Sequence, residues 1–197
     1  MGRILAFFGQ EAQLVKALKK GESKAQRLIY DKYAATMLGL CYRYVGDKMT
    51  AEDIMIVGLT KVFDKIDQFN SEGSLEGWIR RIMVNEALGH IRKQKRLMED
   101  FMVEEVLAIP DYNLIDEKFD EEDLLQLVEE LPIGYRTVFN LYAIEGYNHK
   151  EIAEHLGISE STSKSQLHRA RAMLQSKLLK IETSLKKKIN HEKTSYR

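Results

Sequence analysis

Residues 148–174 read NHKEIAEHLGISESTSKSQLHRARAML and indicate two short helices joined by a tight turn. Asn148 can cap the first helix, and Glu151 three residues later completes a capping box. Gly157 is placed to take the left-handed backbone conformation that ends a helix. The second helix can be capped by one of two serines, Ser159 or Ser161.

The second helix of this stretch has two unlike faces. At about 100° per residue from Lys164, Leu167, Ala170 and Leu174 share one side. The opposite side is polar and basic and consists of Lys164, Ser165, His168, Arg169 and Arg171. One face suits packing and the other suits phosphates and base edges. This pattern predicts a helix-turn-helix whose second helix enters the major groove. The alternative is a plain helical hairpin with a solvated basic face.

Length and composition favour an all-α protein. The 197 residues suffice for one large or two small domains, and an apolar content of 44% supports packed cores. Helical periodicity recurs along the chain, while alternating β-branched runs are absent. We predict two small helical domains joined by an acidic flexible linker. The expected boundaries are 10–96, the linker 97–120, the helix-turn-helix domain 121–180 and a basic tail 181–197 that frays after Leu179.

The formal net charge is zero, but the charges are unevenly distributed. Residues 97–130 hold 13 acidic side chains against the single Lys118, whereas residues 164–197 hold 10 basic side chains against two acidic ones. Such asymmetry is compatible with a nucleic-acid partner, although a net charge of zero taken alone would argue against one. Cys41 is the only cysteine, which excludes an intrachain disulfide and fits a reducing, cytoplasmic location.

Several function classes are disfavoured by what the sequence lacks. No apolar run approaches the length of a membrane span, so we expect no membrane insertion. No glycine loop for phosphates, no metal-ligand constellation and no nucleophile–base pair is found. We therefore predict that the protein is not an enzyme, with no catalytic residue, no metal and no cofactor.

The first domain is expected to contain a basic helix with one tryptophan. Ser74 can cap a helix that reads LEGWIRRIMVNEALGHIRKQKR from residue 75. Basic side chains beside an aromatic ring suit single-stranded DNA, since charge binds the backbone and a flat face stacks on a base. The alternative is that Trp78 fills the core. A preceding helix over 50–69, TAEDIMIVGLTKVFDKIDQF, can be capped by Thr50.

Taken in order, these pieces resemble the bacterial sigma-70 family, and most of all its small extracytoplasmic-function (ECF) class. The resemblance covers about residues 10–180. In the first half it depends on the stretches LIYDKYAATMLGLCYRYVGD, AEDI and KVF. It also depends on the residues that follow them, namely Phe69, Trp78, Arg81, Ile82, Asn85, His90, Ile91 and Arg92. In the second half it depends on LPIGYRTVFNLYAIEGYNHKEIAEHLGISESTSKSQLHRARAML. The resemblance implies a sigma factor that gives RNA polymerase core its promoter specificity.

The resemblance also implies roles for individual residues. Contact with the clamp region of the large catalytic subunit of polymerase is expected from Glu52, Asp53, Ile54, Val57 and Lys61. Recognition and melting of the −10 element is expected from Asn70, Ser71, Ser74, Trp78, Arg80, Arg81, Asn85 and Arg92. Recognition of the −35 element is expected from Ser161, Thr162, Lys164, Ser165, His168, Arg169 and Arg171. An anti-sigma protein is implied as a further partner. The acidic linker resembles the segment that threads toward the active site of the polymerase.

The sequence departs from the family pattern at four positions. Ile56 and Val57 stand where glutamine and an acid are common, which affects the detail of the core contact. Ser163 stands where valine is frequent, which predicts looser packing of the recognition helix. Gly77 should soften the first turn of the melting helix.

Two other functions compete with the sigma-factor interpretation. An operator-binding helix-turn-helix regulator would use residues 148–174 on paired half-sites. An adaptor built of helical hairpins would have no role for the basic faces.

Overall fold

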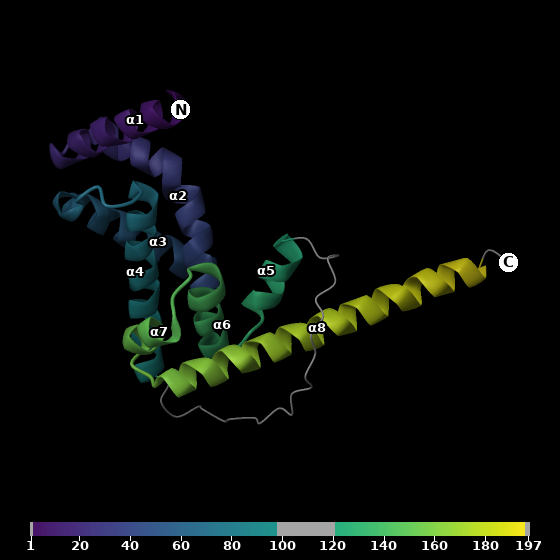
Figure 1. Cartoon of the computed structure of the whole chain (residues 1–197). Helices are drawn as coiled ribbons and strands as arrows, with labels where there is room; N and C mark the ends of the chain where they lie inside the picture. The colour runs from purple at the N-terminus through teal and green to yellow at the C-terminus, as the bar shows by residue number, and fades with distance from the viewer. Residues whose placement is uncertain (1, 98–120, 196–197) are drawn as a thin grey trace. The chain divides into compact units, whose positions relative to one another are not determined.

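The computed structural model describes the backbone of residues 2–97 and 121–195, and the side chains of residues 11–94, 124–181 and 183. Every regular element within these ranges is helical, so the predicted all-α class is confirmed. The chain divides into two compact units, unit 1 over Met1–Asp100 and unit 2 over Phe101–Arg197 (Figure 1). The predicted linker at 97–120 lies outside the described residues except for Leu97. The exact domain boundaries stay a prediction.

Unit 1 packs three long helices against one another. Its elements are α1 (Gly2–Lys19), α2 (Ser23–Val45), α3 (Lys48–Asp64), a 3-10 turn η1 (Ile66–Gln68) and α4 (Leu75–Leu97). The core lies where α2, α3 and α4 meet. Large side chains that are at most 4% exposed there include Ile29, Met37, Leu40, Tyr44, Leu59, Val62, Ile79, Met83 and Leu88. Each such burial contributes about 1.5–3 kcal/mol relative to exposure.

Helix α3 begins earlier than the sequence analysis predicted. The cap is Asp47, whose carboxylate accepts hydrogen bonds from the Thr50 backbone N–H at 2.8 Å and from Thr50 Oγ1 at 2.7 Å. Thr50 therefore lies inside the first turn and is not the cap. The two bonds from Thr50 lower the pKa of Asp47.

The Asp47 cap predicts a pH-dependent contribution to the stability of unit 1. Because the pKa is lowered on folding, the contribution is fully present above the unfolded value of about 4. It is lost as the pH falls through the folded pKa. We expect Asp47→Ala to lower the melting temperature of unit 1 at pH 6 and to match the wild type near pH 2. Thermal melts across that range test this. An equal deficit at both pH values would contradict it.

Cys41 lies near the C-terminal end of α2 and is fully buried. Burial raises the pKa of its thiol to about 12, so the thiolate that reacts with electrophiles is scarce at neutral pH. We expect a maleimide to label the native protein far more slowly than the urea-unfolded protein. Mass spectrometry after timed labelling measures the ratio, and equal rates would contradict the prediction.

Unit 2 contains four α-helices and a π-helical turn in its described part. They are α5 (Glu121–Glu129), α6 (Ile133–Phe139), η2 (Asn140–Ile144), α7 (His149–Leu156) and α8 (Glu160–Ser195). Pro132 precedes α6, where its fixed φ suits a helix start. Buried Arg136 closes the α5–α6 corner by donating from Nη1 to the Glu129 carbonyl at 2.7 Å.

The backbone of α8 continues well beyond the helix-turn-helix. We expected the chain to fray after Leu179, but the structure keeps it helical to Ser195. The helix supplies the buried Leu167, Ala170 and Leu178 to the core of unit 2, which also contains Val138, Leu141 and Ile152. No described helix combines the length and the apolar character that crossing a bilayer requires.

Candidate nucleic-acid interface

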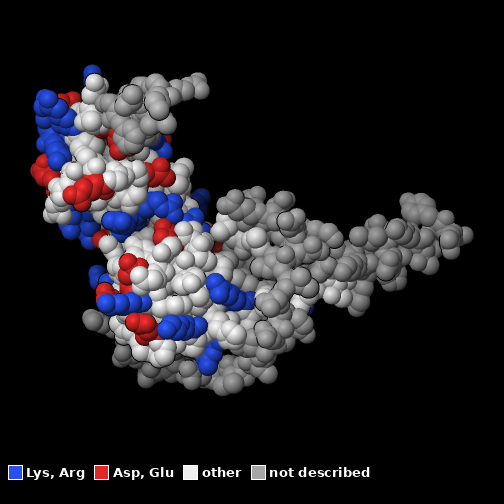
Figure 2. Space-filling view, viewed as in Figure 1, with Lys and Arg blue, Asp and Glu red and all other residues white. Residues whose placement is uncertain are grey.

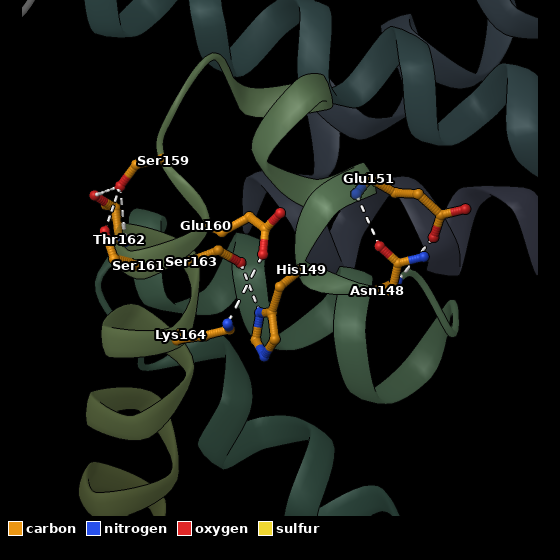
Figure 3. A network of polar contacts seen from close by, with 9 residues as sticks. All are labelled: Asn148, His149, Glu151, Ser159, Glu160, Ser161, Thr162, Ser163 and Lys164. Atoms are coloured by element: carbon orange, nitrogen blue, oxygen red, sulfur yellow. Dashed lines mark hydrogen bonds and ion pairs between the residues drawn. The ribbon is translucent and has the colours of Figure 1, made fainter.

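The turn between α7 and α8 forms as its residues predict. The Asn148 side chain accepts from the Glu151 N–H at 3.0 Å, and the Glu151 carboxylate accepts from the Asn148 N–H at 2.8 Å (Figure 3). The predicted capping box is therefore confirmed. Gly157 ends α7 with a φ of 66°. Its N–H donates to the Ala153 carbonyl, as does that of Ile158 at 3.1 Å.

Ser159 rather than Ser161 caps α8. Ser159 Oγ accepts from the Thr162 N–H at 3.0 Å and lies 2.7 Å from Ser161 Oγ and 2.8 Å from Thr162 Oγ1 (Figure 3). Ser161 and Thr162 thus belong to the first turn of α8, with Ser161 exposed and Thr162 half-buried. Backbone N–H groups at such a helix start suit a phosphate oxygen.

The outer face of α8 carries most of the predicted −35 contacts. Exposed side chains on this face are Ser161, Lys164, Ser165, His168 and Arg171. Lys164 lies 3.8 Å from the Glu160 carboxylate, and both side chains are more than half exposed. Such a pair is weak in water, so Lys164 can exchange it for a phosphate at little cost. Arg171 lies with its guanidinium 5.5 Å from the ring centre of Tyr142.

Arg169 lies at the edge of this face and not at its centre. Its side chain is half-buried, and Nη1 donates to Tyr135 Oη at 3.4 Å. A guanidinium held against α6 is pre-oriented, so it would lose less side-chain freedom on binding an anion. Tyr135 was not predicted as part of this face, because a contact across 34 residues leaves no periodic signal in the sequence.

Ser163 makes a hydrogen bond in the interior of unit 2 that was not predicted from the sequence. It is fully buried, and its Oγ lies 2.9 Å from His149 Nδ1 (Figure 3). The His149 ring in turn stacks on Tyr142, with ring centres 4.7 Å apart. The serine in place of valine is thus matched by a hydrogen-bonding partner on α7. A satisfied buried hydroxyl avoids the cost of an unpaired one.

Helix α4 collects four predicted −10 residues on one side. At about 100° per residue, Trp78, Arg81, Asn85 and Arg92 fall within one narrow sector. Arg81, Asn85 and Arg92 are exposed, while Trp78 is half-buried. Arg80 points away from this sector and is also half-buried, so it does not belong to the same face.

The structure combines the two interpretations of Trp78. Its ring packs on buried Phe69, with ring centres 5.5 Å apart and planes tilted by 47°, while part of the side chain stays accessible. A ring that is supported on one side and open on another can stack on an unpaired base without first losing much mobility.

The loop before α4 brings the remaining −10 residues beside this face. Asn70, Ser71 and Ser74 are exposed. Ser74 Oγ accepts from the Gly77 N–H at 3.0 Å, which confirms Ser74 as the cap of α4. A side chain at Gly77 would approach that oxygen to 3.1 Å, so glycine leaves room for the cap. Ser71 has a φ of +61°, a conformation that few non-glycine residues adopt.

The predicted core-polymerase residues on α3 divide between surface and interior. Asp53 and Val57 are exposed, and Glu52 is half-buried. Ile54 is only 6% exposed and packs in the core of unit 1, so little of its side chain is available at the surface. Lys61 is half-buried and forms an ion pair with Glu86, both carboxylate oxygens lying 2.7 Å from Nζ.

Helix α3 also exposes two apolar side chains that the site prediction missed. Met49 is 77% exposed and Ile56 is 56% exposed, and with Val57 at 47% they form the α3 ridge. These positions fall opposite the buried Ala51, Met55 and Val62 on the helix. Apolar groups that are exposed on one helix face make the α3 ridge a candidate protein-binding surface.

Charge does not separate into one large field on the visible face of unit 1. Figure 2 shows Lys and Arg atoms interspersed with Asp and Glu atoms there. Within the described residues, no three His, Cys, Asp or Glu side chains are grouped to hold a metal ion.

Comparison with known proteins gives consistent matches in both units. Residues 29–97 match the family model described as Sigma-70 region 2, and residues 121–174 match the one described as Sigma-70, region 4. The ECF RNA polymerase sigma factor SigW of Bacillus subtilis is 31% identical over 176 residues, which cover 83% of this chain and 94% of that protein. The RNA polymerase sigma-H factor of Pseudomonas aeruginosa is 28% identical over 174 residues, covering 82% and 90%.

A similar solved structure contains the sigma factor RpoE with the anti-sigma factor NepR from Bartonella quintana. It has 22% identity and a TM-score of 0.47, and it covers 89% of this chain and 98% of that one.

The chain belongs to the sigma-70 family, and within it to the ECF class of RNA polymerase sigma factors. Sigma factors are non-enzymatic proteins of transcription initiation. The interpretation of the chain as an operator-binding regulator is not supported.

Proposed function

We propose that this sigma factor divides its work among three surfaces. The α3 ridge binds the polymerase core, the loop 70–74 with α4 opens the −10 element, and α8 reads the −35 element. The observation that carries the proposal is the α4 face, where Trp78, Arg81, Asn85 and Arg92 share one side of a helix. A protein that binds only duplex DNA has no use for a supported aromatic ring within such a face.

The core contact is proposed to be centred on apolar burial. Ile56 and Val57 expose enough apolar surface to anchor a partner, and exposed Asp53 lies on the same side of α3. Family resemblance points to the clamp region of the large catalytic subunit as that partner. In this arrangement Ile54 supports the helix from behind and makes no direct contact.

Strand opening is proposed to require binding energy and no chemistry. A base stacked on Trp78 gains about 1–3 kcal/mol, which offsets part of the cost of unpairing it. Arg81 and Arg92 can neutralise backbone phosphates, and Asn85 can donate to and accept from a base edge. Loop residues Asn70, Ser71 and Ser74 lie at the start of this face and can contact the displaced strand.

Recognition of the −35 element is proposed to use the outer face of α8. Lys164, His168 and Arg171 meet phosphates or guanine edges, while Ser161, Thr162 and Ser165 position the helix on the backbone. Arg169 contacts DNA from the Tyr135 side. As an ECF sigma factor the protein is proposed to act in the cytoplasm, with core polymerase and promoter DNA as partners. An anti-sigma protein is proposed as its inhibitor.

The test separates core binding from strand opening. The purified chain is mixed with bacterial RNA polymerase core and examined by size exclusion. A promoter duplex with 2-aminopurine in the −10 element then reports opening by fluorescence. We expect Trp78→Ala to co-elute normally but to open at least about fivefold less DNA, the low end of one lost stacking contact.

Trp78→Phe is the matched control, because it keeps a flat ring and should retain most of the opening. Full opening by Trp78→Ala would reject the role given to the α4 face. Failure of the wild-type chain to co-elute would reject the core contact.

A further inference from the structure

Helix α1 lies outside the residues that match region 2 of the family, yet it contacts the loop that precedes α4. The match begins at residue 29, whereas α1 spans Gly2–Lys19. Val15 is 6% exposed and Leu18 is 3% exposed, so the second half of α1 is packed into unit 1. It contacts α2 and η1. Side chains on this part of α1 therefore extend from a fixed support.

Lys19 binds the backbone just before the loop 70–74. Its Nζ donates to the Phe69 carbonyl at 3.2 Å and lies 3.5 Å from the Asp67 carbonyl. Both carbonyls lie at the end of η1, where helical turns leave acceptors without intrahelical donors. An ammonium group suits such a cluster of carbonyl oxygens.

Glu11 binds the backbone just after the loop 70–74. Its Oε1 accepts from the Leu75 N–H at 3.2 Å. Leu75 is the first residue of α4 and is fully buried, so its N–H has no carbonyl within the helix to bind. A carboxylate at this position also complements the positive end of the helix dipole.

The five residues between these two attachments include the backbone that needs most support. Ser71 has a φ of +61° and Gly73 a φ of +93°, and all five residues from Asn70 to Ser74 are exposed. A strained conformation persists only where the surroundings hold it. Phe69 links the two features, because its carbonyl accepts from Lys19 and its ring packs against Trp78.

We propose that Glu11 and Lys19 are positioning residues for promoter opening. They fix both ends of the loop 70–74 from a single helix and thereby set the loop and Trp78 in the geometry that receives the displaced strand. Neither residue needs to touch DNA. The proposal rests on the proposed function of the α4 face, and it adds α1 to the opening machinery.

Hydrogen exchange of the whole protein tests the attachments without DNA. In Glu11→Ala and Lys19→Met, amides of residues 70–75 should exchange about 2- to 10-fold faster, as expected for the net loss of one hydrogen bond. Amides in the middle of α2 should not change. Glu11→Gln and Lys19→Arg keep an acceptor and a donor and should restore slow exchange. Lys20→Met removes the same charge one residue further on and should have no effect.

Promoter opening then tests the consequence. With 2-aminopurine in the −10 element, Glu11→Ala and Lys19→Met should open DNA several-fold more slowly while binding core as tightly as wild type. Wild-type opening rates in both variants would overturn the positioning role, whatever the exchange shows. Unchanged exchange would overturn it as well. If the wild-type chain binds core but opens no promoter, the proposed function of the α4 face fails together with this inference.

Discussion

A variant that carries both Ile56→Glu and Val57→Glu should lose co-elution with RNA polymerase core, with an affinity at least about 100-fold below wild type. The two side chains are 56% and 47% exposed in the free protein, so they contribute little to its stability. They still have much apolar surface to bury on binding. Burying an apolar side chain of this size is worth about 1.5–3 kcal/mol. A carboxylate in the same place must also be desolvated, which adds to the loss.

The matched control for this variant carries both Leu28→Glu and Tyr30→Glu on α2, because these side chains are 58% and 47% exposed and the pair adds the same two negative charges. It should co-elute like wild type. Circular dichroism should show that all three proteins are equally helical. Ile54→Glu is unsuitable as a test, since burying a charge in the core would unfold unit 1. Co-elution of the double variant at wild-type affinity would remove α3 from the proposed core contact.

Gly58→Leu should destabilise unit 1 by about 3 kcal/mol or more, because α3 and α4 approach each other closely at this position. Even a Cβ atom at Gly58 would lie 2.3 Å from Met83 Sδ and 2.9 Å from Met83 Cε. Met83 is fully buried, so its side chain has little room to move away. The expected measurement is a lower urea midpoint for unit 1 with an unchanged transition for unit 2.

Gly39→Ala is the control, since nothing lies within 4 Å of a Cβ at that helical position. It should stabilise the protein by up to about 1 kcal/mol through helix propensity. Adding Met83→Ala to Gly58→Leu should recover part of the loss, so that the two changes are not additive. A wild-type urea midpoint for Gly58→Leu would show that α3 and α4 can separate at no cost.

Local chemistry made much of the fold predictable. The capping box at Asn148, the cap at Ser74 and the glycine at 157 involve partners no more than four residues apart, and all three formed as expected. The predicted start of α3 was wrong because Asp47 and Thr50 both have side chains that can cap a helix. Which of them forms the cap depends on where the helix packs.

The functional surfaces were less predictable because they depend on tertiary packing. Residues 54–59 read IMIVGL, which is apolar on every side of a helix, so periodicity could not separate the core from the α3 ridge. Only the packing of α3 on α2 and α4 buries Ile54 and leaves Ile56 exposed. The contact between His149 and Ser163 and the contact of Lys19 with Phe69 join residues 14 and 50 positions apart. Neither leaves a local pattern.

The attachment of the loop to α1 has a consequence for exchanging parts between sigma factors. A chimaera cut at the limits of the family match, 29–97, would carry Phe69 and Leu75 into a new host but leave Glu11 and Lys19 behind. The host would then have to present its own acceptor and ammonium group at the matching positions. Helix α1 and the loop should therefore be inherited as a pair, and transplants that respect this pairing should be the ones that retain their promoter preference.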